Sequence, residues 1–171
     1  MGIERTLERV ETDLAAGRVP VARQRLRGLV GSFPRNLGIR ARLAEVYRLY
    51  GEPAQAGRWS LLEADRRPEE VAAFEARHPD PVERMRLVAW RGPEEEAATA
   101  FARERLAELR REASRVAGRP LEWGSTDPPT EEGEEIGGIG DTLAGWGCFA
   151  ATLLFLLLAG IGAVTVLRWL W

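Results

Sequence analysis

Apolar residues recur every three or four positions along the first 118 residues of the chain, which is the spacing of one face of a helix. Ile3, Leu7, Val10 and Leu14 form the first such row, and Gly17 follows where a helix end is expected. No convincing stretch alternates apolar and polar residues as a half-buried strand does. The pattern therefore predicts an all-α body.

Proline, asparagine and glycine divide this body into helical hairpins. Pro20 opens a second helix, which ends before Pro34. Asn36 caps a third helix that stops at Gly51, and Pro53 opens a fourth. Each pair of helices is expected to form one antiparallel hairpin.

Three further helices are predicted after these hairpins. Residues 69–78 form a short helix, and residues 80–92 form the next. Pro93 is expected to start the last helix, with Glu94–Glu96 beside the positive end of its dipole and Gly118 at its end. The narrow apolar stripe of this long helix is typical of a helix that caps a stack.

Three pairs of the punctuating residues lie 34 positions apart, namely Gly17 and Gly51, Ala22 and Ala56, and Pro34 and Pro68. A fixed offset of this length is typical of repeats made of helical hairpins. Residues 3–70 resemble the tetratricopeptide repeat, whose pattern has Leu-Gly-x-x-Tyr on the first helix, a small Ala on the second and a closing Pro. The second unit matches this pattern at Leu43, Ala44, Tyr47, Ala56 and Pro68.

The sequence departs from the repeat pattern at several positions. Arg40 replaces the early tryptophan, and Ser60 replaces the aromatic residue of the second helix, with Trp59 beside it. In the first unit, Arg9 and Asp13 stand where Leu and Tyr belong. The resemblance implies stacked hairpins, and the whole layout also resembles an uncharacterised bacterial family of unknown function with a C-terminal membrane anchor. The expected fold is all-α, with tetratricopeptide-like hairpins, a long capping helix and a single C-terminal transmembrane helix.

The strongest apolar signal lies at the C-terminus. Residues 142–167 carry no charge, and Cys148–Leu167 is almost wholly apolar. A helix of these 20 residues is about 30 Å long, the hydrocarbon thickness of a bilayer. Indole rings and a long arginine stem flank the stretch where the membrane interfaces would lie, at Trp146, Arg168, Trp169 and Trp171. We expect a single-pass anchor.

An acidic segment separates the body from this anchor. Residues 119–142 hold seven acidic residues and one arginine, with several prolines and glycines. Such a composition buries too little apolar surface to offset the entropy of ordering, so a flexible linker is predicted. Leu121 and Trp123 are expected to pack at the edge of the body, or else to form a short docking point. The predicted domains are a body at 1–118, a linker at 119–142 and an anchor at 143–171.

The body is expected on the cytoplasmic side of the membrane. The first ten residues are charged and lack the apolar run of a signal peptide. The positive-inside rule indicates the opposite orientation, because Arg168 follows the span and no arginine lies within the 20 residues before it. Exporting a body with 22 arginines and no signal is the harder alternative.

Little in the sequence indicates catalysis. One cysteine and one histidine are too few soft ligands for a zinc or haem site. His78 is interpreted as a surface loop residue that no acid orients, and no phosphate loop, dinucleotide glycine pattern or nucleophile elbow is present. We expect no enzymatic activity, no cofactor and no metal.

The charges are segregated along the chain. All 24 basic residues are arginine, and residues 18–48 carry +7 whereas residues 119–141 carry −6, within a net charge of −2. The candidate face for an anionic partner consists of Arg23, Arg27, Arg35, Arg40 and Arg42. Its alternative ligands are an acidic peptide, anionic lipid, the chain's own residues 131–135 and, least favoured, nucleic acid; an ordinary solvated surface is the remaining interpretation.

These features favour a membrane-tethered adaptor that binds a protein or peptide partner. The alternative is a small membrane protein whose C-terminal helix self-associates and acts in the bilayer, with the body as regulator. Small residues four positions apart in the apolar stretch, Gly147 with Ala151 and Ala159 with Ala163, permit such self-association.

Overall fold

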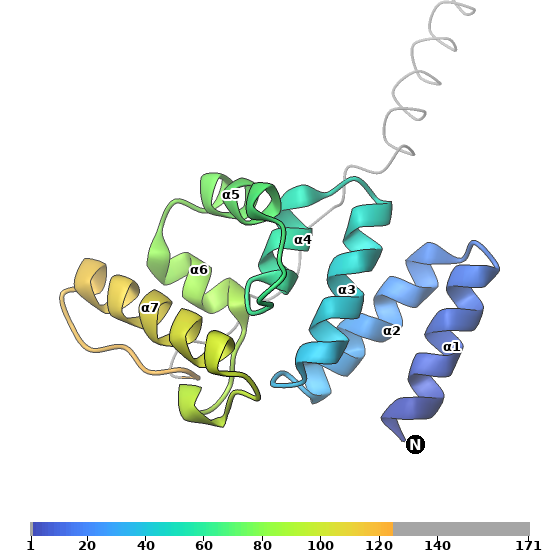
Figure 1. Ribbon diagram of the computed structural model, residues 1–171, viewed down its shortest axis with the longest axis horizontal. Coiled ribbons are helices and arrows are strands. Elements are labelled where there is room, and N and C mark those ends of the chain that lie inside the picture. Colours follow the sequence, from blue (N-terminus) through green and yellow to red (C-terminus); the bar gives the residue numbers. More distant parts are fainter. Residues whose placement is uncertain (1, 125–171) are drawn as a thin grey trace, which may run out of the picture. The chain divides into compact units, whose positions relative to one another are not determined.

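The computed structural model describes residues 2–124, which belong to the first of two units, Met1–Pro129 and Thr130–Trp171. These residues form helices without any strand, which confirms the all-α prediction for this part of the chain (Figure 1). In chain order the elements are α1 (Ile3–Ala15), α2 (Val19–Ser32), α3 (Leu37–Leu49), α4 (Pro53–Ser60), α5 (Pro68–Arg77), α6 (Pro81–Val88), the 3-10 turn η1 (Glu94–Glu96) and α7 (Ala100–Ala117).

Within residues 2–124, no helix combines the length and apolar character that a membrane span requires. The predicted span Cys148–Leu167 lies outside the described residues, and so do its predicted flanking residues Trp146, Arg168, Trp169 and Trp171.

The predicted helix caps are present. The Asn36 side chain accepts a hydrogen bond of 3.1 Å from the Ile39 N–H, and Asp80 accepts one of 2.9 Å from Val82. Each side chain satisfies an N–H group that has no partner within its own helix. Local signals in the sequence thus place the starts of α3 and α6 correctly.

The 34-residue offset is reproduced in local geometry. Gly17 and Gly51 both adopt left-handed backbone conformations, with φ of 71° and 69°. In each case the next residue donates its backbone N–H to the carbonyl oxygen of the residue five positions earlier. Arg18 donates to Asp13 at 2.8 Å, and Glu52 donates to Tyr47 at 3.1 Å. The small residues that follow, Ala22 and Ala56, are both fully buried. The two hairpins therefore close with the same turn.

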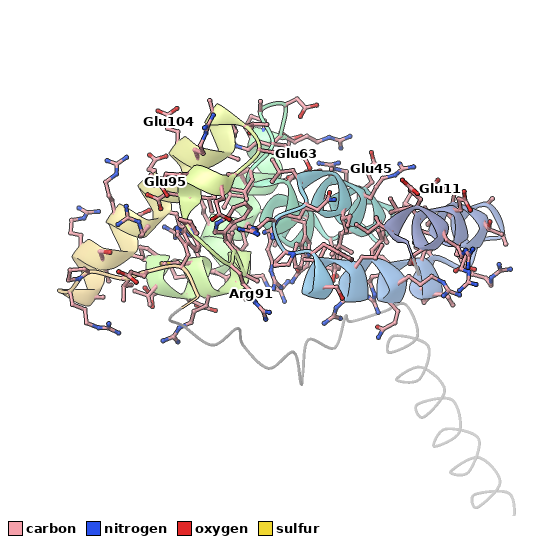
Figure 2. The ribbon with its side chains drawn as sticks, turned by 90° about the horizontal axis from the view of Figure 1, so that it is seen from below. Glu11, Glu45, Glu63, Arg91, Glu95 and Glu104 are labelled. Atoms are coloured by element: carbon pink, nitrogen blue, oxygen red, sulfur yellow. The ribbon has the colours of Figure 1, made fainter. Side chains whose placement is uncertain are left out.

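Consecutive helices pack against each other from α1 through α5, and α6 packs against α7. Ion pairs also join alternate helices. Arg42 of α3 pairs with Glu11 of α1 and with Glu45 of its own helix, and Glu11 and Glu45 lie along one edge of the unit in Figure 2. Arg48 of α3 makes two hydrogen bonds of 2.7 Å to the buried Glu70 of α5. The odd-numbered helices are thus linked laterally.

Two predicted boundaries are wrong. The helix expected at 80–92 ends at Val88, because Ala89 takes a left-handed conformation with φ of 51° and Trp90 turns into the core. The last helix begins at Ala100 rather than at Pro93, because the hydroxyl of Thr99 caps it with a bond of 3.1 Å to the Ala102 N–H. Glu94–Glu96 form a separate 3-10 turn before it.

The packed body continues past α7. Gly118 ends that helix, as predicted, and has a left-handed conformation; the chain then folds back along α7. Leu121 is 3 % exposed within the apolar core formed by residues that follow α4, from Leu61 to Ala113, and Trp123 packs against the same core. Both residues lie at the edge of the body, in agreement with the first of the two interpretations given above.

Gly57 of α4 marks the closest approach between helices α4 and α5. A Cβ atom at this position would lie 2.0 Å from the carbonyl oxygen of Glu70, so we expect Gly57→Ala to destabilise the chain by ~2 kcal/mol or more. Gly28 of α2 is the control, because its Cβ would meet nothing within 4 Å and Gly28→Ala should stabilise by up to ~1 kcal/mol. Urea unfolding followed by circular dichroism measures both; equal effects would contradict the packing described.

Candidate functional site

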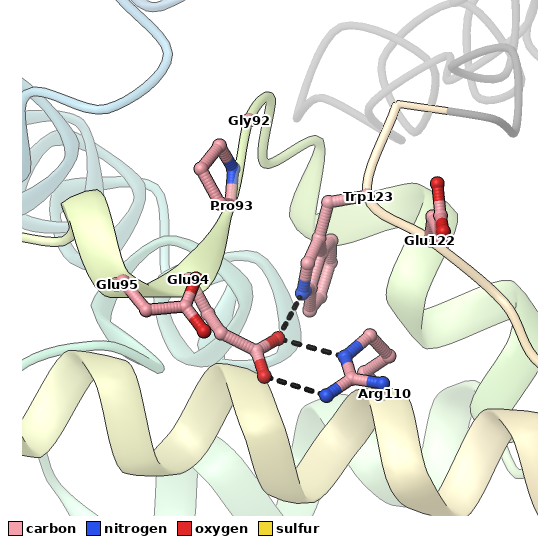
Figure 3. Close-up of a pocket in the computed structure, with 7 residues that line it drawn as sticks. All are labelled: Gly92, Pro93, Glu94, Glu95, Arg110, Glu122 and Trp123. Atoms are coloured by element: carbon pink, nitrogen blue, oxygen red, sulfur yellow. Dashed lines mark hydrogen bonds and ion pairs between the residues drawn. The ribbon is translucent and has the colours of Figure 1, made fainter.

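A cavity of about 440 Å³ lies between the 3-10 turn, α7 and the segment that follows α7 (Figure 3). This volume lies in the range of ligand pockets, ~300–1,000 Å³. The wall combines an indole ring, a proline ring, three carboxylates and one guanidinium group. The residues that line it are Gly92, Pro93, Glu94, Glu95, Arg110, Glu122 and Trp123. We refer to it as the Trp123 pocket.

Glu94 holds the pocket together. Arg110 donates two hydrogen bonds to its carboxylate, at 2.8 and 2.7 Å, and the indole N–H of Trp123 donates a third at 2.9 Å (Figure 3). These bonds keep the pKa of Glu94 below its usual value, with Arg110 as the main cause, although burial acts in the opposite direction. Glu94 is only 9 % exposed, and the guanidinium of Arg110 compensates its charge within the site.

The outer part of the pocket is acidic. Three carboxylates and one guanidinium give the wall a formal charge of −2. The pKa of Arg110 is raised, first by the hydrogen bonds to Glu94 and further by the charges of Glu94, Glu95 and Glu122. Glu95 is exposed and makes no ion pair within residues 2–124. The site therefore offers uncompensated negative charge beside an aromatic wall.

A second, smaller cavity of about 250 Å³ lies where α5, α6 and α7 meet. Leu61, Phe74 and Leu109 supply its apolar part. Arg84, which is 8 % exposed, also lines it and pairs with Glu112 at 3.1 Å. The charged groups of this cavity largely neutralise one another, which makes it a weaker candidate than the Trp123 pocket.

The predicted arginine face is not one surface. Arg23 lies over the ring of Tyr50 at 5.1 Å, at the C-terminal end of α3, whereas Arg35 precedes α3 and pairs with Glu96. Arg42 pairs with Glu11 and Glu45, as described above, and Arg27 is half-buried. Much of the positive charge between residues 18 and 48 is therefore bound by the chain's own carboxylates.

Asp13 illustrates this internal pairing. It is 5 % exposed and accepts hydrogen bonds from Arg25 at 2.8 Å and from Arg18 at 2.8 and 3.0 Å. The two arginines keep the pKa of Asp13 below its usual value, with the bond from Arg25 as the largest cause. Sequence reasoning placed Asp13 only as a departure from the repeat pattern.

Arg40 corrects the prediction most clearly, because it is buried and 1 % exposed. Its guanidinium donates to the carbonyl oxygens of Pro34 at 3.1 Å and Val88 at 2.5 Å, and lies 5.2 Å from the ring centre of Trp59. Burial is the main cause that lowers the pKa of Arg40, to about 9, and the nearby charge of Arg58 adds to it. The feature of the sequence that indicates burial is the position of Arg40 in the repeat pattern, where a large buried tryptophan is expected.

His78 also differs from its interpretation as an unoriented surface residue. Its Nδ1 lies 2.8 Å from the carboxylate of Glu83, and its ring packs at 5.4 Å from that of Phe74. The side chain is only 14 % exposed. An acid therefore does orient this histidine. In the described part of the chain, no three His, Cys, Asp or Glu side chains are grouped so as to hold a metal ion.

Two arginines on α3 allow the structural role of Arg40 to be tested. We expect Arg40→Gln to lower the free energy of unfolding by ~3 kcal/mol or more, because it removes charged hydrogen bonds from buried carbonyls. The exposed Arg42→Gln should cost less than ~1 kcal/mol. Urea unfolding of both variants measures the difference; equal losses would refute the structural role.

The pH dependence of stability tests the Glu94 site. Since the pKa of Glu94 is lowered on folding, its contribution is complete above pH ~4.5 and is lost as the pH falls through the lowered folded value. Glu94→Gln should therefore destabilise the chain by ~1–3 kcal/mol at pH 7 and by much less near pH 3. Asp13 is present in both proteins, so its contribution to the pH dependence of the free energy of unfolding cancels in the comparison. A constant difference across this range would contradict the assignment.

Comparisons with known proteins give a family but no activity. No curated protein and no solved structure matches the chain. A family model described as a family of unknown function, DUF6584, matches residues 1–168. The match extends over the helical body and the predicted linker and anchor. The chain therefore belongs to the family of unknown function DUF6584.

Proposed function

We propose that this chain is a membrane-tethered helical-repeat module that binds a protein partner and has no catalytic activity of its own. The observation that carries the proposal is the repetition of one helical hairpin after 34 residues. The same left-handed glycine, the same backbone hydrogen bond and the same buried alanine recur in both hairpins. Repeats of this kind stack, and stacked hairpins expose an extended surface on which partners bind.

The lateral ion pairs support a tetratricopeptide-like stack. Arg42 joins α3 to α1, Arg48 joins α3 to α5, and Arg105 of α7 lies 3.8 Å from Glu75 of α5. Alternate helices therefore follow one another along one side of the body. Charged side chains are already paired there, so a partner would meet a surface of nearly neutral pairs rather than a basic face.

The tether is supported by the sequence alone. The uncharged stretch Cys148–Leu167 is long enough to cross a bilayer, and aromatic residues flank it. The body would then lie on the cytoplasmic side. An adaptor of this kind uses its anchor only for location, whereas the alternative, a helix that self-associates and acts in the bilayer, depends on the identity of the span.

An anchor exchange separates these two functions. Residues 142–171 are replaced by an unrelated single-span anchor, and a photo-crosslinking amino acid is placed at Leu49, which is 67 % exposed at the end of α3. We expect the same crosslinked partner with either anchor, and we expect both proteins to stay in the membrane fraction after alkaline extraction. The Gly57→Ala variant, with a disturbed body, should lose the crosslink.

Two outcomes would contradict the proposal. Loss of the crosslink on anchor exchange alone would favour the function in the bilayer. Release of the native chain by alkaline extraction would remove the membrane tether and leave only the interaction module.

A further inference from the structure

The Trp123 pocket is made by segments that lie far apart in the sequence. Glu95 comes from the 3-10 turn and Pro93 directly precedes that turn. Arg110 comes from α7, and Trp123 from the segment after α7. The N–H of Leu121 donates to the hydroxyl of Ser114 at 3.0 Å, which fixes the chain as it turns back along α7. Because its walls are packed and hydrogen-bonded, the pocket exists before any ligand arrives.

The inner polar groups of the pocket are already occupied. Both carboxylate oxygens of Glu94 accept hydrogen bonds from Arg110, and one of them also accepts the indole N–H of Trp123. A ligand would have to break these bonds to use Glu94. The faces that remain for a ligand are the indole ring of Trp123, the ring of Pro93 and the carboxylate of Glu95 (Figure 3).

This combination selects the charge of the ligand. The exposed carboxylate of Glu95 in the wall repels phosphate and carboxylate groups. The face of an indole ring attracts a guanidinium or ammonium group electrostatically, and an aliphatic stem packs well against a proline ring. A neutral ligand would gain nothing from the exposed charge of Glu95.

We propose that the Trp123 pocket binds an arginine or lysine side chain of a protein partner, with its charged group stacked on Trp123 and paired with Glu95. The cavity, at about 440 Å³, leaves room for neighbouring atoms of the partner chain as well as for the side chain itself. The inference rests on the proposed function in one respect only: the arginine or lysine is assumed to belong to the protein partner proposed above. It changes the expected sign of the partner from acidic to basic, because the arginines predicted to bind an acidic partner are mostly paired internally or buried.

The test is direct binding to the purified full chain in detergent micelles at 0.15 M salt. The probe is a fluorescein-labelled peptide of alternating glycine and arginine, and its counterpart has citrulline, which keeps the shape and loses the charge. Fluorescence anisotropy should show saturable binding of the arginine peptide and binding of the citrulline peptide that is at least about tenfold weaker.

Variants locate the binding site. Glu95→Arg should weaken binding of the arginine peptide by about tenfold or more, because it replaces an attractive charge by a repulsive one at an exposed position. Trp123→Leu should weaken it by about threefold or more, because the aromatic face is lost. The matched control is Glu8→Arg, since Glu8 is exposed on α1, at the opposite end of the row of helices from α7 in Figure 1.

Three results would overturn the inference: no saturable binding, equal binding of the citrulline peptide, or an equal loss in Glu8→Arg, which would indicate a general charge effect. Because Glu95 is exposed, its variant is expected to fold, and circular dichroism verifies this. The experiment uses no membrane partner, so its failure leaves the anchor exchange and the proposed function standing.

Discussion

Two buried guanidinium groups that both lie against the ring of Trp59 join the first two hairpins to the rest of the described unit. Arg40 of α3 donates to the Val88 carbonyl at 2.5 Å, and Arg58 of α4 donates to the Leu87 carbonyl at 2.7 Å. Both carbonyls lie at the C-terminal end of α6, where the helix dipole is negative and no N–H of the helix can reach them. Apolar side chains could fill this volume but could not satisfy these oxygens, so the position of α6 depends on the two arginines.

The position of the Trp123 pocket follows from this arrangement. Since α6 stops at Val88, the next eleven residues cross as an irregular connection that includes the 3-10 turn before α7 begins. The ion pair between Arg35 and Glu96 holds this connection from the side of the first hairpins, and the pair between Glu94 and Arg110 holds it from the side of α7. A pocket held from both sides is more rigid than the surface loop from which it is built.

The sequence predicted those features that neighbouring residues decide. Caps at Asn36 and Asp80 and helix ends at Gly17 and Gly51 depend on a few adjacent positions, and the structure confirms them, with both glycines in left-handed conformations. The missed features depend on partners far along the chain. Pro93 followed by three glutamates has the pattern of a helix start, but the actual cap is Thr99, and the first glutamate is bound by Arg110 instead.

The same distinction explains the arginines and the candidate site. The charge pattern places Arg40 and Arg42 on one face because they lie two positions apart, but only Arg42 faces solvent. Nothing local in the sequence indicates that Val88 lies beside Arg40. The Trp123 pocket likewise required knowing that residues 94, 110 and 123 meet.

The exclusive use of arginine then acquires a structural meaning at particular positions. Glu94 and Glu70 are each held by two parallel hydrogen bonds from a single guanidinium, and Asp13 receives two bonds from Arg18 alone. A lysine ammonium has no planar fork with which to reproduce this geometry. A coding bias could account for arginine on the solvent side of the helices, but it does not explain why the carboxylates buried in this unit meet guanidinium groups in this orientation. At these sites the packing of the helices buries a carboxylate, and the buried carboxylate requires arginine as its cation.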